Sequence, residues 1–138
     1  MTGTDDAGET LPPMGAHVSV AGGLARAVER GREIEATALQ VFTKQPQRWA
    51  EPDRSEEEAE AFRAAIAESP VAVTVSHDSY LINLASEKDD LFRKSLRAFR
   101  AELERCVRLG IDFLVTHPGN ATGGDRSEAL RRNAGALG

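Results

Sequence analysis

The chain has 138 residues, of which 41% are hydrophobic and 28% are charged, and it contains no long apolar run. This composition excludes a bilayer-spanning protein, which needs about 20 consecutive apolar residues, and the length suffices for one small domain with its own core. The formal charge of −5 argues against a protein that coats nucleic acid by charge alone, so any contact with DNA must be local.

Residues 1–13 are polar, acidic and closed by two prolines, which predicts a disordered extension ahead of a domain at residues 14–138. They lack the basic start and the apolar stretch of a signal peptide. The single cysteine, Cys106, has no partner for an internal disulfide, and we expect it to pack rather than react. These features favour a reducing, cytoplasmic location.

Four short runs rich in β-branched residues predict strands at residues 14–20, 37–43, 71–76 and 111–116. Each run is too short and too apolar for a strand with one face in solvent, so we expect all four to be buried on both faces. Longer segments with helical spacing separate the runs. The pattern therefore predicts an α/β fold in which right-handed crossovers join parallel strands.

Three helices follow the first three strands. The first is expected at residues 24–34, and the second runs to residue 67 from a capping box made by Ser55 and Glu58. The third is expected to end at Gly110 and to bury one apolar stripe. That stripe consists of Phe92, Leu96, Phe99, Leu103 and Val107. After a loop at residues 119–125, a fourth helix is expected to begin at Ser127.

Two architectures share this alternation: an open doubly wound sheet, and part of an eight-stranded (β/α) barrel. A complete barrel typically needs about 250 residues, so length alone favours the open sheet. In both architectures the groups that perform chemistry gather beyond the carboxyl ends of the strands.

The three histidines, His17, His77 and His117, fall in or just after the predicted first, third and fourth strands. A single histidine is more often structural, but His77 and His117 together suit a zinc site. Asp78 would then fix the tautomer of a ligating imidazole without itself binding the metal. Catalytic zinc usually takes three protein ligands. No strong third candidate is evident, because Asp112 lies at the start of the fourth strand, at the opposite end of the sheet.

Two predicted loops have unusual compositions. Tyr80 and Leu81 follow the third strand, where they either form an apolar wedge that enters a DNA stack or cover the core. The loop after the second strand offers Lys44 and Arg48 for contacts with phosphates and Trp49 as an anchor. A solvated loop with a buried tryptophan is the alternative, and these residues alone leave both choices open.

Five segments, in their order along the chain, resemble the amino-terminal half of endonuclease IV, the zinc-dependent family that cuts DNA at abasic sites. They are GAHVS at residues 15–19, GGL at 22–24, FTKQPQRW at 42–49, HDSYLINL at 77–84 and HPG at 117–119. The likeness covers about residues 14–135, and the HDSYLIN string together with HPG is highly specific.

The resemblance implies a (β/α)8 TIM barrel of the xylose-isomerase-like kind, with three zinc ions at the carboxyl ends of its strands. His77 and His117 match two of the family's zinc ligands, whereas His17 matches a position near the site that is not a ligand. Tyr80 and Leu81 match residues that the family inserts into DNA at the damaged position. The implied partner is therefore double-stranded DNA that contains abasic sites.

The implied reaction is hydrolysis of the phosphodiester on the 5′ side of an abasic nucleotide by a zinc-dependent deoxyribonuclease of DNA repair. Clustered zinc suits it, because metal ions neutralise the phosphate and stabilise the leaving oxygen. An abasic site is also easily deformed, since one base is already unstacked. The family commonly has an inserting arginine where Gln47 stands, so the division of work between Gln47 and Arg48 stays open.

The sequence stops at Gly138, four units into an eight-unit barrel, and the family's carboxylate ligands would lie beyond it. We therefore expect a partial form of a monomeric enzyme that, alone, binds zinc weakly and cleaves little DNA. Two alternatives remain. One is a non-catalytic half-barrel module that pairs with another chain to close its sheet, and the other is a metal-dependent sugar isomerase or epimerase with the same barrel.

Overall fold

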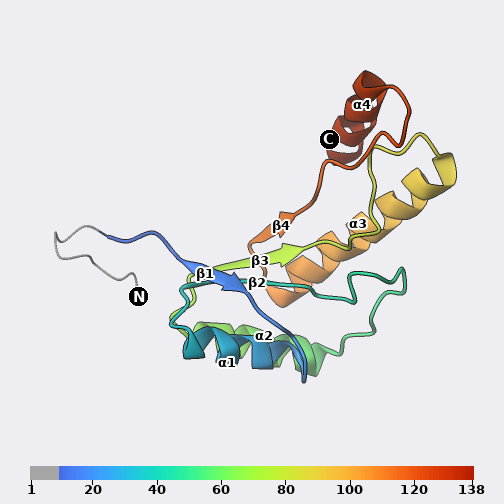
Figure 1. Ribbon diagram of the computed structural model, residues 1–138. Helices are drawn as coiled ribbons and strands as arrows, with labels where there is room; N and C mark the ends of the chain where they lie inside the picture. Colours follow the sequence, from blue (N-terminus) through green and yellow to red (C-terminus); the bar gives the residue numbers. More distant parts are fainter. Residues whose placement is uncertain (1–9) are drawn as a thin grey trace.

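The computed structural model describes residues 10–138, in which parallel strands alternate with helices (Figure 1). The strands are β1 (Gly15–His17), β2 (Ala38–Val41), β3 (Val73–His77) and β4 (Phe113–Val115). The helices are α1 (Leu24–Glu33), α2 (Glu56–Ala67), α3 (Asp89–Leu109) and α4 (Arg126–Leu137). The predicted series of four βα units is confirmed.

The winding of the sheet decides between the two architectures. The strands pair in chain order, β1-β2-β3-β4, and all pairs are parallel. Side chains of α1, α2 and α3 join those of β2 in one apolar core, so these helices cover the same face of the sheet. A doubly wound sheet reverses its strand order and has helices on both faces, whereas a barrel does neither. The fold is that of four units of a TIM barrel.

The core forms where β2 faces the helices. Leu39 and Val41 are each 2% exposed and belong to one cluster with Leu24 of α1 and Phe62 of α2. Burial of each such side chain stabilises the fold by about 1.5–3 kcal/mol. This cluster therefore fixes the direction in which β2 and its neighbours point their other side chains.

The opposite face of the sheet is open. Alternate residues of a strand point to opposite faces, and the register places His17 beside Gln40 and His77 beside Val115 on this open face. The expectation that all strands are buried on both faces is wrong. β1 is exposed throughout, β4 is almost so, and β2 and β3 alternate between buried and half-buried residues. The reason is that, within residues 10–138, helices cover one face only.

Local signals locate the helix ends well. The Ser55 hydroxyl accepts a hydrogen bond from the Glu58 amide at 3.1 Å, which confirms the predicted cap of α2. Gly110 ends α3 in the left-handed conformation, with φ of 67°, where a side chain would be strained. The start of α4 differs slightly from its prediction. Asp125, rather than Ser127, caps this helix, and its carboxylate accepts from the Glu128 amide at 2.8 Å.

The buried face of α3 differs from the predicted stripe. Phe99 is buried, but Leu103 and Val107 are 43% and 82% exposed. Glu102 and Arg105 instead lie on the buried face. The stripe prediction failed because it counted apolar residues alone, whereas a charged pair that satisfies its own hydrogen bonds can occupy a core position.

The expected extension at residues 1–13 lies mostly outside the described residues; residues 11–13 are exposed. No helix within residues 10–138 is both long enough and apolar enough to cross a membrane. α4 lies beyond the carboxyl end of β4 (Figure 1), and Ala129 is its buried residue.

Candidate functional site

His77 and His117 face each other at the carboxyl ends of two neighbouring strands. His77 is the last residue of β3, and His117 lies two residues beyond the end of β4. Their Nε2 atoms are 3.1 Å apart, and the ring centroids are separated by 4.9 Å at an interplanar angle of 53°. Parallel pairing of β3 and β4 brings together two residues that are 40 positions apart in the sequence.

The backbone of Asp78 fixes the tautomer of His77. The Nδ1 atom of His77 lies 2.8 Å from the carbonyl oxygen of Asp78, which accepts but cannot donate, so Nδ1 carries the proton and donates. The lone pair is therefore on Nε2, the atom that faces His117. The carboxylate of Asp78 is farther away, with Oδ1 at 3.8 Å from Nδ1, and it accepts a hydrogen bond from the Thr116 hydroxyl. Burial raises the pKa of this carboxyl.

This pair of imidazoles fits a zinc ion. Two nitrogens bound tetrahedrally at the usual Zn–N distance of about 2.0–2.1 Å are roughly 3.3 Å apart, close to the separation seen here. A ligating histidine typically donates its other N–H to a carbonyl or carboxylate, as His77 does. Residues 10–138 contain no group of three or more His, Cys, Asp or Glu side chains placed to share an ion. The described part of the chain thus offers two ligands.

His17 lies on the open face, but Phe42 separates it from the pair. The ring of Phe42 is centred 4.5 Å from that of His17 and 5.6 Å from that of His77. The Nδ1 atom of His17 is 2.9 Å from the amide nitrogen of Gln40. Burial, and then repulsion from His77, lower the pKa of His17. Asp112 is at the other end of the sheet, as expected, where its carboxylate accepts hydrogen bonds from Thr74.

Tyr80 projects beside the histidine pair. It is 58% exposed, and its ring meets Phe42 edge-on at 5.3 Å and His77 at 6.0 Å. The backbone of Tyr80 is held by a 2.9 Å hydrogen bond from its N–H to the carbonyl of Pro46. Leu81 is half-buried. The structure therefore presents an aromatic ring to solvent next to the two imidazoles.

The loop after β2 exposes Gln47 and Arg48, but it does not expose Lys44. Lys44 is 6% exposed, and its ammonium group donates to Glu51 Oε1 at 2.8 Å and to the carbonyl of Trp49 at 3.2 Å. The expectation that Lys44 offers a cation to phosphates does not agree with this geometry. A carboxylate seven positions away in the same loop neutralises the ammonium and draws it inward.

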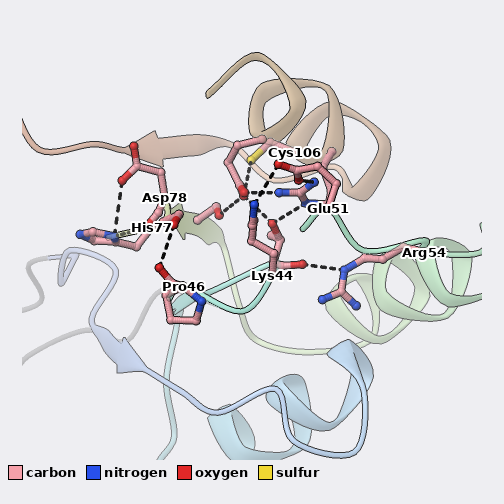
Figure 2. Close-up of polar contacts among 12 residues, drawn as sticks. Lys44, Pro46, Glu51, Arg54, His77, Asp78 and Cys106 are labelled. Carbon is pink, nitrogen blue, oxygen red and sulfur yellow. Dashed lines mark hydrogen bonds and ion pairs between the residues drawn. The ribbon is translucent and has the colours of Figure 1, made fainter. Parts of the chain in front are cut away.

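Beneath this loop lies a buried polar network, shown in Figure 2, that sequence reasoning missed. Glu102 is 1% exposed; it accepts hydrogen bonds from the hydroxyls of Ser76, at 2.7 Å, and Thr43, and it pairs with Arg105. Arg105 also donates to Glu51 Oε2 at 2.8 Å. The network joins the loop after β2, the end of β3 and α3. The sequence held one signal for this network: Glu102 and Arg105 follow Phe99 at three-residue spacing, which places all three side chains on the same face of α3.

A shallow hollow of about 300 Å³ opens beside His117. Its lining comes from the loops after β3 and β4: Ser79, Tyr80, Ile82, Asn83, His117, Gly119 and Asn120. The histidine pair, an exposed aromatic ring and a polar wall thus meet at the carboxyl edge of the sheet. In TIM barrels this edge carries the active site.

A family model described as the xylose isomerase-like TIM barrel matches residues 28–138. The chain therefore belongs to this family, in agreement with the order of its strands.

Within that fold, the chain is similar to endonuclease IV, as its motifs predicted. It is 43% identical over 127 residues to the probable endonuclease 4 of Chloroflexus aurantiacus, a match covering 92% of this chain and 45% of that protein. The crystal structure of endonuclease IV from Thermus thermophilus matches with a TM-score of 0.79 and 37% identity, over 91% of this chain and 46% of that one. The chain thus spans about half the length of these proteins.

The fold is also shared with a sugar-converting enzyme. A crystal structure of D-psicose 3-epimerase matches with a TM-score of 0.66 over 90% of this chain and 46% of the other. The identity is 13%, so this match shows the common fold alone.

Proposed function

We propose that this chain is part of a zinc-dependent DNA repair endonuclease that hydrolyses the phosphodiester 5′ to an abasic site. The observation that supports this proposal is the placement of two Nε2 atoms 3.1 Å apart at the carboxyl edge of a barrel sheet. The similarity to endonuclease 4 proteins favours a nuclease over the other activities that the barrel supports.

In this proposal His77 and His117 hold one zinc ion through Nε2. The carbonyl of Asp78 keeps the proton of His77 on Nδ1, so the lone pair stays available for the metal. Zinc supplies Lewis-acid chemistry, which neutralises charge on a phosphate and lowers the barrier to its hydrolysis. His17 lines the open face without ligating.

The contacts with DNA fall to two neighbouring loops. Tyr80, backed by the ring of Phe42, enters the gap left by a missing base, together with the less exposed Leu81. Gln47 and Arg48, exposed on the loop after β2, meet the strand that this wedge displaces. Lys44 has a different task, which is to hold that loop in place through Glu51.

A metal titration tests the ligand assignment. We expect the chain to bind Zn²⁺ weakly, and His77→Ala or His117→Ala to abolish the binding detected by calorimetry. His17→Ala is the matched control and should leave the affinity within twofold. Equal zinc binding by the His77→Ala/His117→Ala double variant would refute the assignment.

Binding to DNA is tested separately, by fluorescence anisotropy with a duplex that carries a tetrahydrofuran abasic analogue and with its undamaged counterpart. We expect preference for the damaged duplex, retained in Tyr80→Phe, which keeps the ring, and lost in Tyr80→Ala. The same affinity for both duplexes in the unsubstituted chain would count against a damage-recognition surface.

A further inference from the structure

The side chain of Asn83, in the loop between β3 and α3, clamps the loop that follows β4. Its Oδ1 atom accepts hydrogen bonds from the amide of Asn120 at 3.0 Å and from the amide of Ala85 at 3.1 Å. Its Nδ2 atom donates to the carbonyl of Asn120 at 2.9 Å. One side chain thus contacts both the N–H and the C=O of the same distant residue. Two opposed hydrogen bonds fix both the distance and the orientation of that segment.

The clamp is anchored at one end and tightly packed at the other. The backbone N–H of Asn83 donates to the hydroxyl of Ser95 at 2.9 Å, and Ser95 is fully buried on α3. Gly119 passes directly over the amide of Asn83. A Cβ at Gly119 would lie 2.3 Å from Asn83 Oδ1 and 3.0 Å from the Cβ of Ala85, and its φ is +96°. The loop can approach this closely because residue 119 has no side chain.

The clamp acts on the segment that carries His117. The pairing of β3 and β4 fixes His77, which lies opposite Val115, but the ladder ends there and His117 is beyond it. From Val115 to the clamp at Asn120 the chain has a short span without regular structure, and His117 is inside that span. Fixing both ends of a short segment limits where its side chains can point.

We propose that Asn83 is a positioning residue that holds His117 against His77 and thereby sets the separation of the two metal-ligating nitrogens. The inference deepens the proposed function and rests on it for the identity of the ion, but not for the contact between the two rings. Asn83 itself touches neither imidazole through any hydrogen bond in residues 10–138. Its effect on the metal is transmitted by the backbone of Gly119 and Asn120.

The ring contact is measured directly by NMR on the metal-free chain, from the nuclear Overhauser effect between the imidazole protons of His77 and His117. We expect this signal in the unsubstituted chain and in Asn120→Ala, which keeps the backbone partner of the clamp. It should be lost in Asn83→Ala and partly retained in Asn83→Asp, because an aspartate still accepts from both amides. Persistence of the full signal in Asn83→Ala would overturn the inference.

Zinc affinity provides the second readout. Asn83→Ala should raise the zinc dissociation constant by about tenfold, a loss comparable to that of a direct hydrogen-bond partner of a ligating histidine, and Asn120→Ala should not. Far-ultraviolet circular dichroism checks that both variants are folded. Loss of the ring contact in Asn83→Ala supports the inference whether or not the unsubstituted chain binds zinc. If that chain binds no zinc, the metal proposal fails and the positioning role of Asn83 stands. Unchanged affinity and an unchanged ring contact would defeat the inference alone.

Discussion

At the scale of single residues, Asp78 shows how one position serves both faces of a strand end. Its carbonyl oxygen orients His77 on the open face, while its own carboxylate, 1% exposed, turns to the covered face and accepts from Thr116. The sequence suggested that Asp78 holds the tautomer of His77. The atom closest to Nδ1, however, is the backbone oxygen, which every residue type possesses, so the identity of the side chain could not have revealed the contact.

Cys106 provides a prediction at this scale. Burial, followed by the nearby charge of Glu102, raises the pKa of its thiol from the ordinary 9.0 to about 11. At pH 8 the native chain therefore contains roughly 100-fold less thiolate than an exposed cysteine, and we expect alkylation by iodoacetamide to be correspondingly slow until urea unfolds the protein. Mass spectrometry measures the rate of labelling, and rapid labelling of the folded chain would contradict the expected protection of Cys106.

The same shift gives a pH dependence. Above pH 9 the unfolded thiol releases its proton, whereas the folded thiol keeps its proton up to a pH of about 11. The unfolded state then binds fewer protons than the native state, so the free energy of unfolding must fall as pH rises through this interval. Cys106→Ala should lack this component, which urea denaturation at several pH values would measure.

At the scale of elements, α3 shows why a helix can be located more easily than its contacts. Gly110 ends α3, and the Ser55 cap begins α2. Both ends were predicted correctly, because each depends on residues only a few positions apart in the sequence. Glu102 and Asn83 have partners 26 to 59 positions away, in other elements. Only the fold brings such groups together, which is why the motifs of the sequence drew attention to His77 and His117 but not to the buried network or to the Asn83 clamp.

The buried pair of Glu102 and Arg105 carries a prediction for α3. Glu102→Ala removes the buried partner of Arg105 and leaves that guanidinium only the partly exposed Glu51, so this change should lower the free energy of unfolding by about 3 kcal/mol. Replacing both, as Glu102→Leu with Arg105→Met, should cost less than the single change, because no charge is stranded. Glu104→Ala, on the exposed side of the same helix, is the control and should stay within about 0.5 kcal/mol. Additive losses in urea denaturation would contradict the pairing.

At the scale of the whole molecule, the alternation of strands and helices left an open sheet and a barrel both possible, and only the motifs pointed to the barrel. Strand pairing in chain order, which the structure supplies, agrees with that interpretation. The exposure of the sheet was not predicted. β1 and β4 end the sheet, and apolar side chains of β4 and of α3 remain in solvent, with Phe113 61% and Val107 82% exposed. A surface of this kind is the main physical difference between these four units and a closed barrel.

These edges predict how the 138-residue chain behaves in solution. An end strand offers unpaired N–H and C=O groups, and neighbouring apolar side chains reinforce any pairing, so we expect self-association that increases with concentration. Phe113→Lys combined with Val107→Lys should shift sedimentation velocity profiles towards the monomer, because contact would have to desolvate one ammonium group at β4 and one on α3. Ile34→Lys, at a 55% exposed apolar position that follows α1, should change little. If the unsubstituted chain sediments as a monomer at every concentration, the sheet edges do not drive association, and the half-barrel module that pairs with a second copy loses its physical basis.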